Sequence, residues 1–138
     1  MKLVVDASVA IKWFVGAIDE QHVAQADAVA AAIERSETEL LAPGHWTIEV
    51  IAVLARRDPG LVDGALLALD DMTPTLIHGV AVLKRAADMA IALGHHLFDT
   101  LYHAVALEVG ATLVTADEVY FNKARHLGAI QLLADFKA

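Results

Sequence analysis

The sequence predicts an α/β fold, a three-layer α/β/α sandwich around a mainly parallel sheet of about five strands. Three observations predict it. Short apolar runs alternate with longer helical stretches along all 138 residues. The apolar runs end at charged or turn residues, as buried strands do. The helical stretches carry apolar residues at helical spacing and many alanines, which favour helix. No repeat or linker divides the chain, so we expect one domain over 1–138.

Each element has its own signal. Five short apolar runs are predicted as strands: 2–5, 39–42, 75–78, 111–115 and 129–133. Six stretches are predicted as helices: 21–36, 43–57, 61–71, 80–93, 97–109 and 118–127. Pro43 suits a first helical turn, and Asp58-Pro59-Gly60 is a stop and turn signal. Gly94 is a plausible C-cap.

The composition excludes several classes of protein. The chain has no cysteine, which removes disulfides, thiolate zinc sites and cysteine nucleophiles and suits a reducing compartment. Its start is unlike a signal peptide, and no apolar run reaches the roughly 18 residues that span a membrane. We therefore expect a cytoplasmic protein. With 57% hydrophobic residues, both a large core and some apolar surface for a partner are expected.

The formal net charge is −8, which counts against nucleic-acid binding through a broad basic face. Four acids gathered at one site would supply half of this charge, and two divalent cations would cancel that half. Any nucleic-acid binding would therefore depend on metal that neutralises the site first.

Four acidic residues stand next to apolar elements, at strand ends or on helices: Asp6, Glu49, Asp99 and Asp117. Asp6 and Asp117 each follow a predicted strand, which places both at the carboxyl edge of the sheet, where open parallel sheets bind ligands. Glu49 lies between apolar residues, and metal coordination would remove the cost of burying it. Each acid alone has another interpretation, a helix cap for the aspartates and a surface charge for Glu49.

Together the four acids indicate a site for a hard cation. Oxygen ligands without cysteine suit Mg²⁺ or Mn²⁺ rather than zinc, and carboxylate-held metals activate water and stabilise phosphoryl oxygens. Ser8 could cap the next turn or contact a metal-bound water. Thr115 is placed to hydrogen-bond a neighbouring carboxylate or water. His103 lies one turn after Asp99 on the same helix face; it either reaches the site or is an ordinary hydrogen-bonded or surface histidine.

Four segments carry a family resemblance. They are 3–14, Pro43 with Trp46 and Glu49-Val50, 98–106 and 113–117. In this order they resemble the motifs of the PIN-domain ribonucleases, and among these the toxins of VapBC-type toxin–antitoxin pairs. The resemblance covers essentially the whole chain.

The resemblance implies that Asp6, Glu49, Asp99 and Asp117 bind metal and that Ser8 and Thr115 support them. It also implies a Mg²⁺-dependent endoribonuclease that cleaves structured RNA, often transfer or ribosomal RNA. Its expected partners are a second copy in a homodimer and a small antitoxin across the active-site face. Our hypothesis is that the three aspartates hold the first ion, while Glu49 holds a second ion or orients the attacking water.

The remaining features leave alternatives open. Lys12, Lys123 and Arg125 are candidates for RNA contacts or are ordinary solvated charges. The apolar residues Trp13, Phe14, Trp46 and 50–54 either form a groove for an amphipathic antitoxin segment or pack in the core.

Two other functions compete with the ribonuclease. A haloacid-dehalogenase-type phosphatase also has an aspartate after its first strand, but it needs a second aspartate two residues later, where this chain has Ser8. A PIN-fold binding module without catalysis is the other alternative.

Overall fold

The computed structural model describes residues 1–16 and 18–137. Its centre is a five-stranded sheet with strand order β3-β2-β1-β4-β5. The strands are β1 (Lys2–Val5), β2 (Glu39–Ala42), β3 (Thr75–Leu76), β4 (Thr112–Thr115) and β5 (Ile130–Leu132). All four pairings between them are parallel. The predicted α/β class is confirmed.

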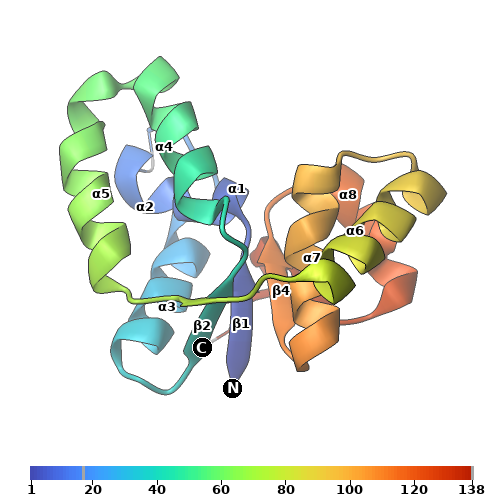
Figure 1. The fold of residues 1–138 in the computed structure, drawn as a ribbon. Helices are drawn as coiled ribbons and strands as arrows, with labels where there is room; N and C mark the ends of the chain where they lie inside the picture. Colours follow the sequence, from blue (N-terminus) through green and yellow to red (C-terminus); the bar gives the residue numbers. More distant parts are fainter. Residues whose placement is uncertain (17, 138) are drawn as a thin grey trace.

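Eight α-helices surround this sheet in the described part of the chain. They are α1 (Ala7–Ala10), α2 (Lys12–Val15), α3 (Val23–Glu34), α4 (Trp46–Arg57), α5 (Val62–Asp71), α6 (Val80–Leu93), α7 (Leu97–Val109) and α8 (Glu118–Ala124). Short 3-10 helices follow at Pro59–Leu61, Arg125–Leu127 and Leu133–Asp135. In Figure 1, α2 to α5 lie to the left of β1, and α6 to α8 lie to its right. None of the described helices is long and apolar enough to cross a membrane.

The best predicted elements are α6 and α7, whose bounds match the expectation. Gly94 and Gly110 end them with φ of +60° and +70°, the left-handed conformation that glycine adopts at little cost. Two other predictions were less accurate. Helix α4 begins at Trp46 rather than at Pro43, whose carbonyl accepts a hydrogen bond from the Trp46 N–H. Strand β3 has only two residues and is an edge strand that pairs with β2 alone.

The order of the strands positions the site. β1 is the central strand, and the chain moves from it first toward β2 and β3 and then back to β4 and β5. The point between β1 and β4 is therefore the topological switch point, where open parallel sheets bind ligands. Asp6 lies there, and its N–H donates a 3.0 Å hydrogen bond to the Val114 carbonyl of β4. Helices α4 and α7 stand on either side of α1 at this end of the sheet (Figure 1).

The core takes up most of the residues that were considered for an antitoxin groove. Trp46, Val50 and Leu54 are at most 1% exposed. Trp13 is half-buried, packs edge-on against Trp46 and donates its indole N–H to the Ala26 carbonyl at 2.8 Å. The groove hypothesis is therefore wrong for Trp46, Val50 and Leu54, for which core packing is the correct interpretation.

Candidate metal centre

Two hydroxyl groups hold the carboxylate of Asp6. Ser8 Oγ and Thr115 Oγ1 each donate a 2.8 Å hydrogen bond to Asp6 Oδ2. Ser8 Oγ also accepts a hydrogen bond from the Ala116 N–H, which fixes the serine in turn. Within the described ranges Asp6 Oδ1 has no protein donor, so it remains available for another ligand. Thr115 thus contacts a carboxylate, as predicted, and Ser8 contacts the same carboxylate directly.

The site makes ionisation of Asp6 costly. The pKa of Asp6 is raised from 3.8 to about 6, mainly by burial and to a smaller extent by the negative charges of Asp99 and Asp117. The hydrogen bonds from Thr115 and Ser8 oppose this rise, because they stabilise the charged form. A nearby cation would remove the penalty that burial and like charge impose.

Glu49 reaches the same place from the first turn of α4. Tyr102 on α7 is fully buried, and its hydroxyl donates a 3.1 Å hydrogen bond to Glu49 Oε2. Burial raises the pKa of Glu49 from 4.5 to about 7, with smaller contributions from the charges of Asp6 and Asp99. The same burial raises the pKa of Tyr102, so the phenol stays protonated and remains a donor.

Side chains at this edge form two overlapping groups of potential ligands. Asp6, Glu49 and Asp99 offer one oxygen each, and these atoms lie within 4.8 Å of one another. His95, Asp99 and Asp117 form a second group within the same limit. Asp99 belongs to both. The structure therefore brings the four predicted acids together, but it pairs Glu49 with Asp6 and Asp99 instead of setting it apart from the aspartates.

The described residues supply little positive charge to this cluster. No lysine or arginine among them forms an ion pair with any of the four acids; the two partners within 4.0 Å are His45 and His95. Crowded carboxylates, of which Asp6 and Glu49 have raised pKa values, without a lysine or arginine partner among the described residues are suited to a hard divalent cation.

Asp117 also caps a helix, as its alternative interpretation predicted. Its Oδ1 accepts a 3.0 Å hydrogen bond from the Tyr120 N–H, and its own N–H donates to Thr115 Oγ1 at 3.0 Å. The cap uses one carboxylate oxygen and fixes the side chain at the start of α8. A capping role and a ligand role are compatible here, since Oδ2 is not used by the cap.

Two histidines contact the acids without having been predicted. His95 Nε2 lies 2.7 Å from Asp99 Oδ2. His45 Nε2 lies 2.9 Å from the Phe98 carbonyl and 3.4 Å from Glu49 Oε1. Burial lowers the pKa of His45, so the neutral ring donates its N–H to that carbonyl. Spacing was an available signal for both, because each lies four residues before the acid it contacts.

His103 is a hydrogen-bonded core residue. It is fully buried, with Nε2 at 2.7 Å from the Gly128 carbonyl and Nδ1 at 3.0 Å from the Tyr120 hydroxyl. Burial lowers its pKa and favours the neutral ring, which donates from Nε2 and accepts at Nδ1. Both ring nitrogens are therefore engaged away from the acids.

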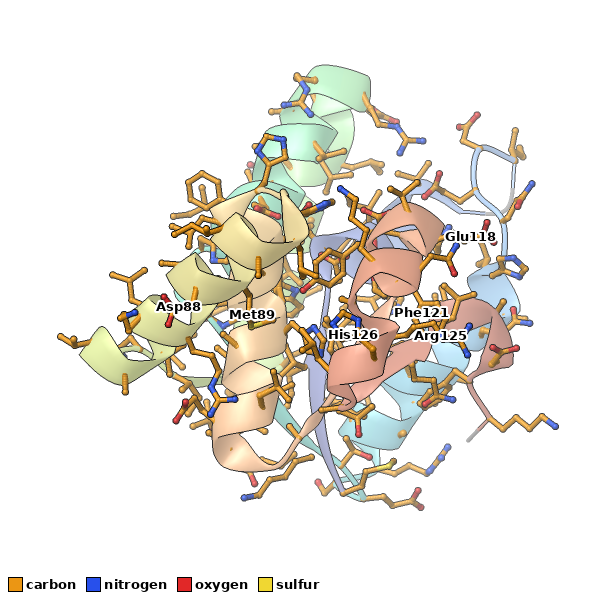
Figure 2. The ribbon with its side chains drawn as sticks, turned by 90° about the vertical axis from the view of Figure 1, so that its right-hand side faces the viewer. Asp88, Met89, Glu118, Phe121, Arg125 and His126 are labelled. Atoms are coloured by element: carbon orange, nitrogen blue, oxygen red, sulfur yellow. The ribbon has the colours of Figure 1, made fainter. Side chains whose placement is uncertain are left out.

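The three basic candidates have different environments. Lys12 is buried, and its Nζ lies 3.4 Å from Glu20 Oε1, so its proposed role as a surface RNA contact is wrong. The Arg125 guanidinium lies 5.2 Å from the centroid of the Phe121 ring. Figure 2 shows these two residues next to each other near the end of α8. Lys123 is exposed and lines a cavity of about 440 Å³ together with His95.

Comparisons with known proteins agree with this architecture. The family model "PIN domain" matches residues 3–127. A toxin–antitoxin complex from Klebsiella pneumoniae has a TM-score of 0.71 at 15% identity, covering 95% of this chain and 97% of that one. VapBC2 from Rickettsia felis, bound to a DNA fragment from their promoter, has a TM-score of 0.68 at 10% identity, covering 96% and 97%.

A third solved structure, VapBC-1 from nontypeable Haemophilus influenzae, has a TM-score of 0.62 at 15% identity and covers 98% of this chain and 100% of that one. Comparison with the curated proteins gives no significant match. At these identities the solved structures establish the fold, while the family model extends over nearly the whole chain and all four acids. The five-stranded parallel sheet, the acids at its switch point and the matching model together show that this chain belongs to the PIN-domain family.

Proposed function

We propose that this protein is a VapC-type toxin, an endoribonuclease that depends on Mg²⁺ or Mn²⁺ and cleaves structured RNA such as transfer or ribosomal RNA. The observation that carries the proposal is the convergence of four carboxylates from four separate elements, with Asp99 common to both ligand groups. A binding module has no need to keep such a cluster together against its own repulsion.

The metal would be held by Asp6, Glu49 and Asp99, with Asp117 beside them. When bound, a divalent cation activates water and offsets charge on phosphoryl oxygens. The protein's own contribution is orientation. Ser8 and Thr115 fix one oxygen of Asp6, and Tyr102 fixes one oxygen of Glu49, so that the carboxylates do not have to reorganise when charge develops.

Glu49 is suited to accept the proton of the attacking water. Tyr102 contacts only its Oε2, so Oε1 can accept a proton at the cluster. In the proposed hydrolysis the water oxygen bonds to phosphorus in line with the 3′ oxygen and the water proton goes to Glu49. The bond from phosphorus to the 3′ oxygen breaks, and the released 3′ oxygen takes a proton from solvent. Tyr102, which contacts Glu49 Oε2, keeps that carboxylate directed toward the cluster.

RNA requires positive charge near the acids, and the chain has little. Exposed Lys123 lines a cavity beside His95, and Arg125 lies on the surface near it in sequence. These two are the remaining candidates for contacts with the RNA backbone. The net charge of −8 makes prior metal binding a condition for RNA binding.

A small antitoxin is the proposed inhibitory partner, and a second copy in a homodimer is the other proposed partner. All three solved structures named above come from toxin–antitoxin systems. Two apolar side chains next to the acids are exposed: Ile48, which precedes Glu49, is 69% exposed, and Phe98, which precedes Asp99, is 60% exposed. An antitoxin that covers both would gain apolar burial while closing the site.

The test is incubation of the pure protein with total RNA, in parallel with Mg²⁺ and with EDTA. The proposal expects cleavage with Mg²⁺, none with EDTA, and none with Asp6→Asn in either condition. Metal-independent cleavage would reject the site, and no cleavage at any protein concentration would favour the binding module. The phosphatase alternative has lost its support, because Ser8 bonds to Asp6 where that chemistry needs a second carboxylate.

A further inference from the structure

A lysine and a histidine connect to the acid that both ligand groups share. Lys123 Nζ on α8 lies 3.2 Å from His95 Nδ1, and His95 Nε2 lies 2.7 Å from Asp99 Oδ2. Lys123 Nζ also lies 3.4 Å from the Gly94 carbonyl, which fixes it beside the loop between α6 and α7. The side chains come from α8, from the loop between α6 and α7, and from α7. They form one chain of hydrogen bonds that ends at the cluster.

The direction of these hydrogen bonds follows from Lys123. An ammonium group has only donors, so Nδ1 of His95 must be the acceptor and carries no proton. The ring proton is then on Nε2, which donates it to Asp99 Oδ2. A proton on Nδ1 would face the ammonium group at 3.2 Å. Lys123 therefore selects the tautomer in which His95 has no free lone pair to offer a metal.

Packing holds the imidazole in this place. The Tyr120 ring lies against His95, with 4.9 Å between the ring centroids. Tyr120 is itself fixed, since its hydroxyl donates to His103 Nδ1 and its N–H donates to Asp117 Oδ1. A single aromatic residue thus supports His95 with its ring and Asp117 with its backbone.

We propose that His95 is a positioning residue of the metal centre, oriented by Lys123, and not a ligand of the metal. Its Nε2–H holds one oxygen of Asp99, so the carboxylate shared by the two groups keeps one orientation and its other oxygen stays available. Lys123 brings positive charge near the cluster without occupying it. Partners that orient metal-binding carboxylates in this way tune metal affinity. This inference rests on the proposed metal centre.

Mn²⁺ titration calorimetry without RNA measures the effect directly. We expect His95→Leu to weaken Mn²⁺ binding about tenfold, in the range typical for loss of an orienting partner. His95→Gln keeps an N–H donor and should bind within about threefold of the parent, since the net worth of the retained hydrogen bond is modest. Lys123→Met should cost about threefold for the same reason. His96→Leu, in the same loop and exposed, is the matched control and should bind like the parent.

Pulsed electron paramagnetic resonance of the Mn²⁺-loaded parent gives a second readout. The proposal expects no ¹⁴N coupling of the strength that a directly bonded imidazole gives. Such a coupling, lost in His95→Leu, would overturn the proposal and make His95 a ligand. If His95→Gln bound Mn²⁺ as weakly as His95→Leu, the proposal would also be overturned, because the N–H donor would then not account for the affinity.

The calorimetry separates this inference from the function it rests on. If the parent binds Mn²⁺, Asp6→Asn does not, and His95→Leu binds as tightly as the parent, only the role of His95 is overturned. If the parent binds no Mn²⁺, the metal centre and the role of His95 are both overturned.

Discussion

Thr115 Oγ1 donates a 2.8 Å hydrogen bond to Asp6 Oδ2, joining residues 109 positions apart in the sequence. Thr115 ends β4 and Asp6 follows β1, and these strands are neighbours in the sheet with Val5 paired to Val114. The contact crosses the switch point of the fold. One hydroxyl thus fixes the orientation of the most buried acid and opposes the rise of its pKa.

Thr115→Val should weaken Mn²⁺ binding about tenfold or more, because a hydrogen bond to a charged group is worth about 1.5–3 kcal/mol. The substitution conserves shape and removes only the hydroxyl. Titration calorimetry measures the change. Thr112→Val, at the other end of β4, is the matched control and should bind metal like the parent. Equal affinity of Thr115→Val and the parent would show that this hydrogen bond does not organise the centre.

Metal binding should strengthen as pH rises from about 6 to about 7 and level off above. Protons compete with metal for Asp6 and Glu49, whose pKa values in the metal-free protein are about 6 and about 7. Below this window both carboxyls are protonated, and above it both are ionised. Calorimetry at pH 6 in buffers of different ionisation enthalpy should detect proton release on binding. A binding constant that does not change between about pH 5.5 and about pH 7.5 would contradict the raised pKa values of Asp6 and Glu49.

The metal-free protein should lose stability over a related range. The folded pKa values of Asp6 and Glu49 are above their usual values of 3.8 and 4.5, so the folded state holds protons that the unfolded chain releases. The stability that these bound protons contribute to the folded state is fully present below about pH 4 and is lost as pH rises through about 7.

Asp6→Asn should therefore raise the free energy of unfolding of the metal-free protein by about 2 kcal/mol at pH 7.5, since each pKa unit corresponds to about 1.4 kcal/mol and relaxation reduces the full effect. Urea denaturation with EDTA present measures it. A decrease in stability would mean that burial and nearby negative charges do not destabilise the ionised carboxylate of Asp6.

Tyr102→Phe should move the pH dependence of metal binding to higher pH. The hydroxyl that it removes donates to Glu49 Oε2 and thereby lowers the pKa of Glu49. Loss of this hydrogen bond should therefore raise the pKa of Glu49. Tyr120→Phe is the matched control, because its hydroxyl contacts His103 and none of the acids. The midpoint of binding against pH should shift in Tyr102→Phe alone; an equal shift in both variants would point to a general loss of packing.

His103→Leu should reduce stability by about 2–3 kcal/mol, because it leaves the Gly128 carbonyl and the Tyr120 hydroxyl without their buried partner. Urea denaturation measures this. Where the variant stays folded, its Mn²⁺ affinity should remain within about threefold of the parent, since the ring contacts no acid. A large loss of affinity at normal stability would place His103 in the centre after all.

The sequence predicted the elements whose signals are local. Strand β2 and helix α7 have the expected bounds, because apolar periodicity and a closing glycine mark them. Helices α1 and α2 were not predicted. Each has only four residues, too short for periodicity to appear, and they form because the chain must turn away from the carboxyl end of β1.

Prediction of the site reached its acids and the supporting residues Ser8 and Thr115, but not the partners of Glu49 and Asp99. Asp6 and Asp117 could be placed at one edge because strand ends of a parallel sheet meet there. The hydrogen bond from Tyr102 to Glu49 could not be predicted, since it joins α7 to α4 across 53 positions. The contact of His95 with Asp99 was not predicted, because α7 begins at Leu97 and the four-residue spacing relates residues within a helix.

Mapping of RNA ends after brief expression of the protein tests the central claim, that the four acids form one ribonuclease site. The account predicts new ends at a small number of positions in transfer or ribosomal RNA. These should be absent with Asp6→Asn and present with Asp27→Asn, an exposed aspartate on α3 that serves as the matched control. The same new ends with Asp6→Asn as with the parent would contradict the account.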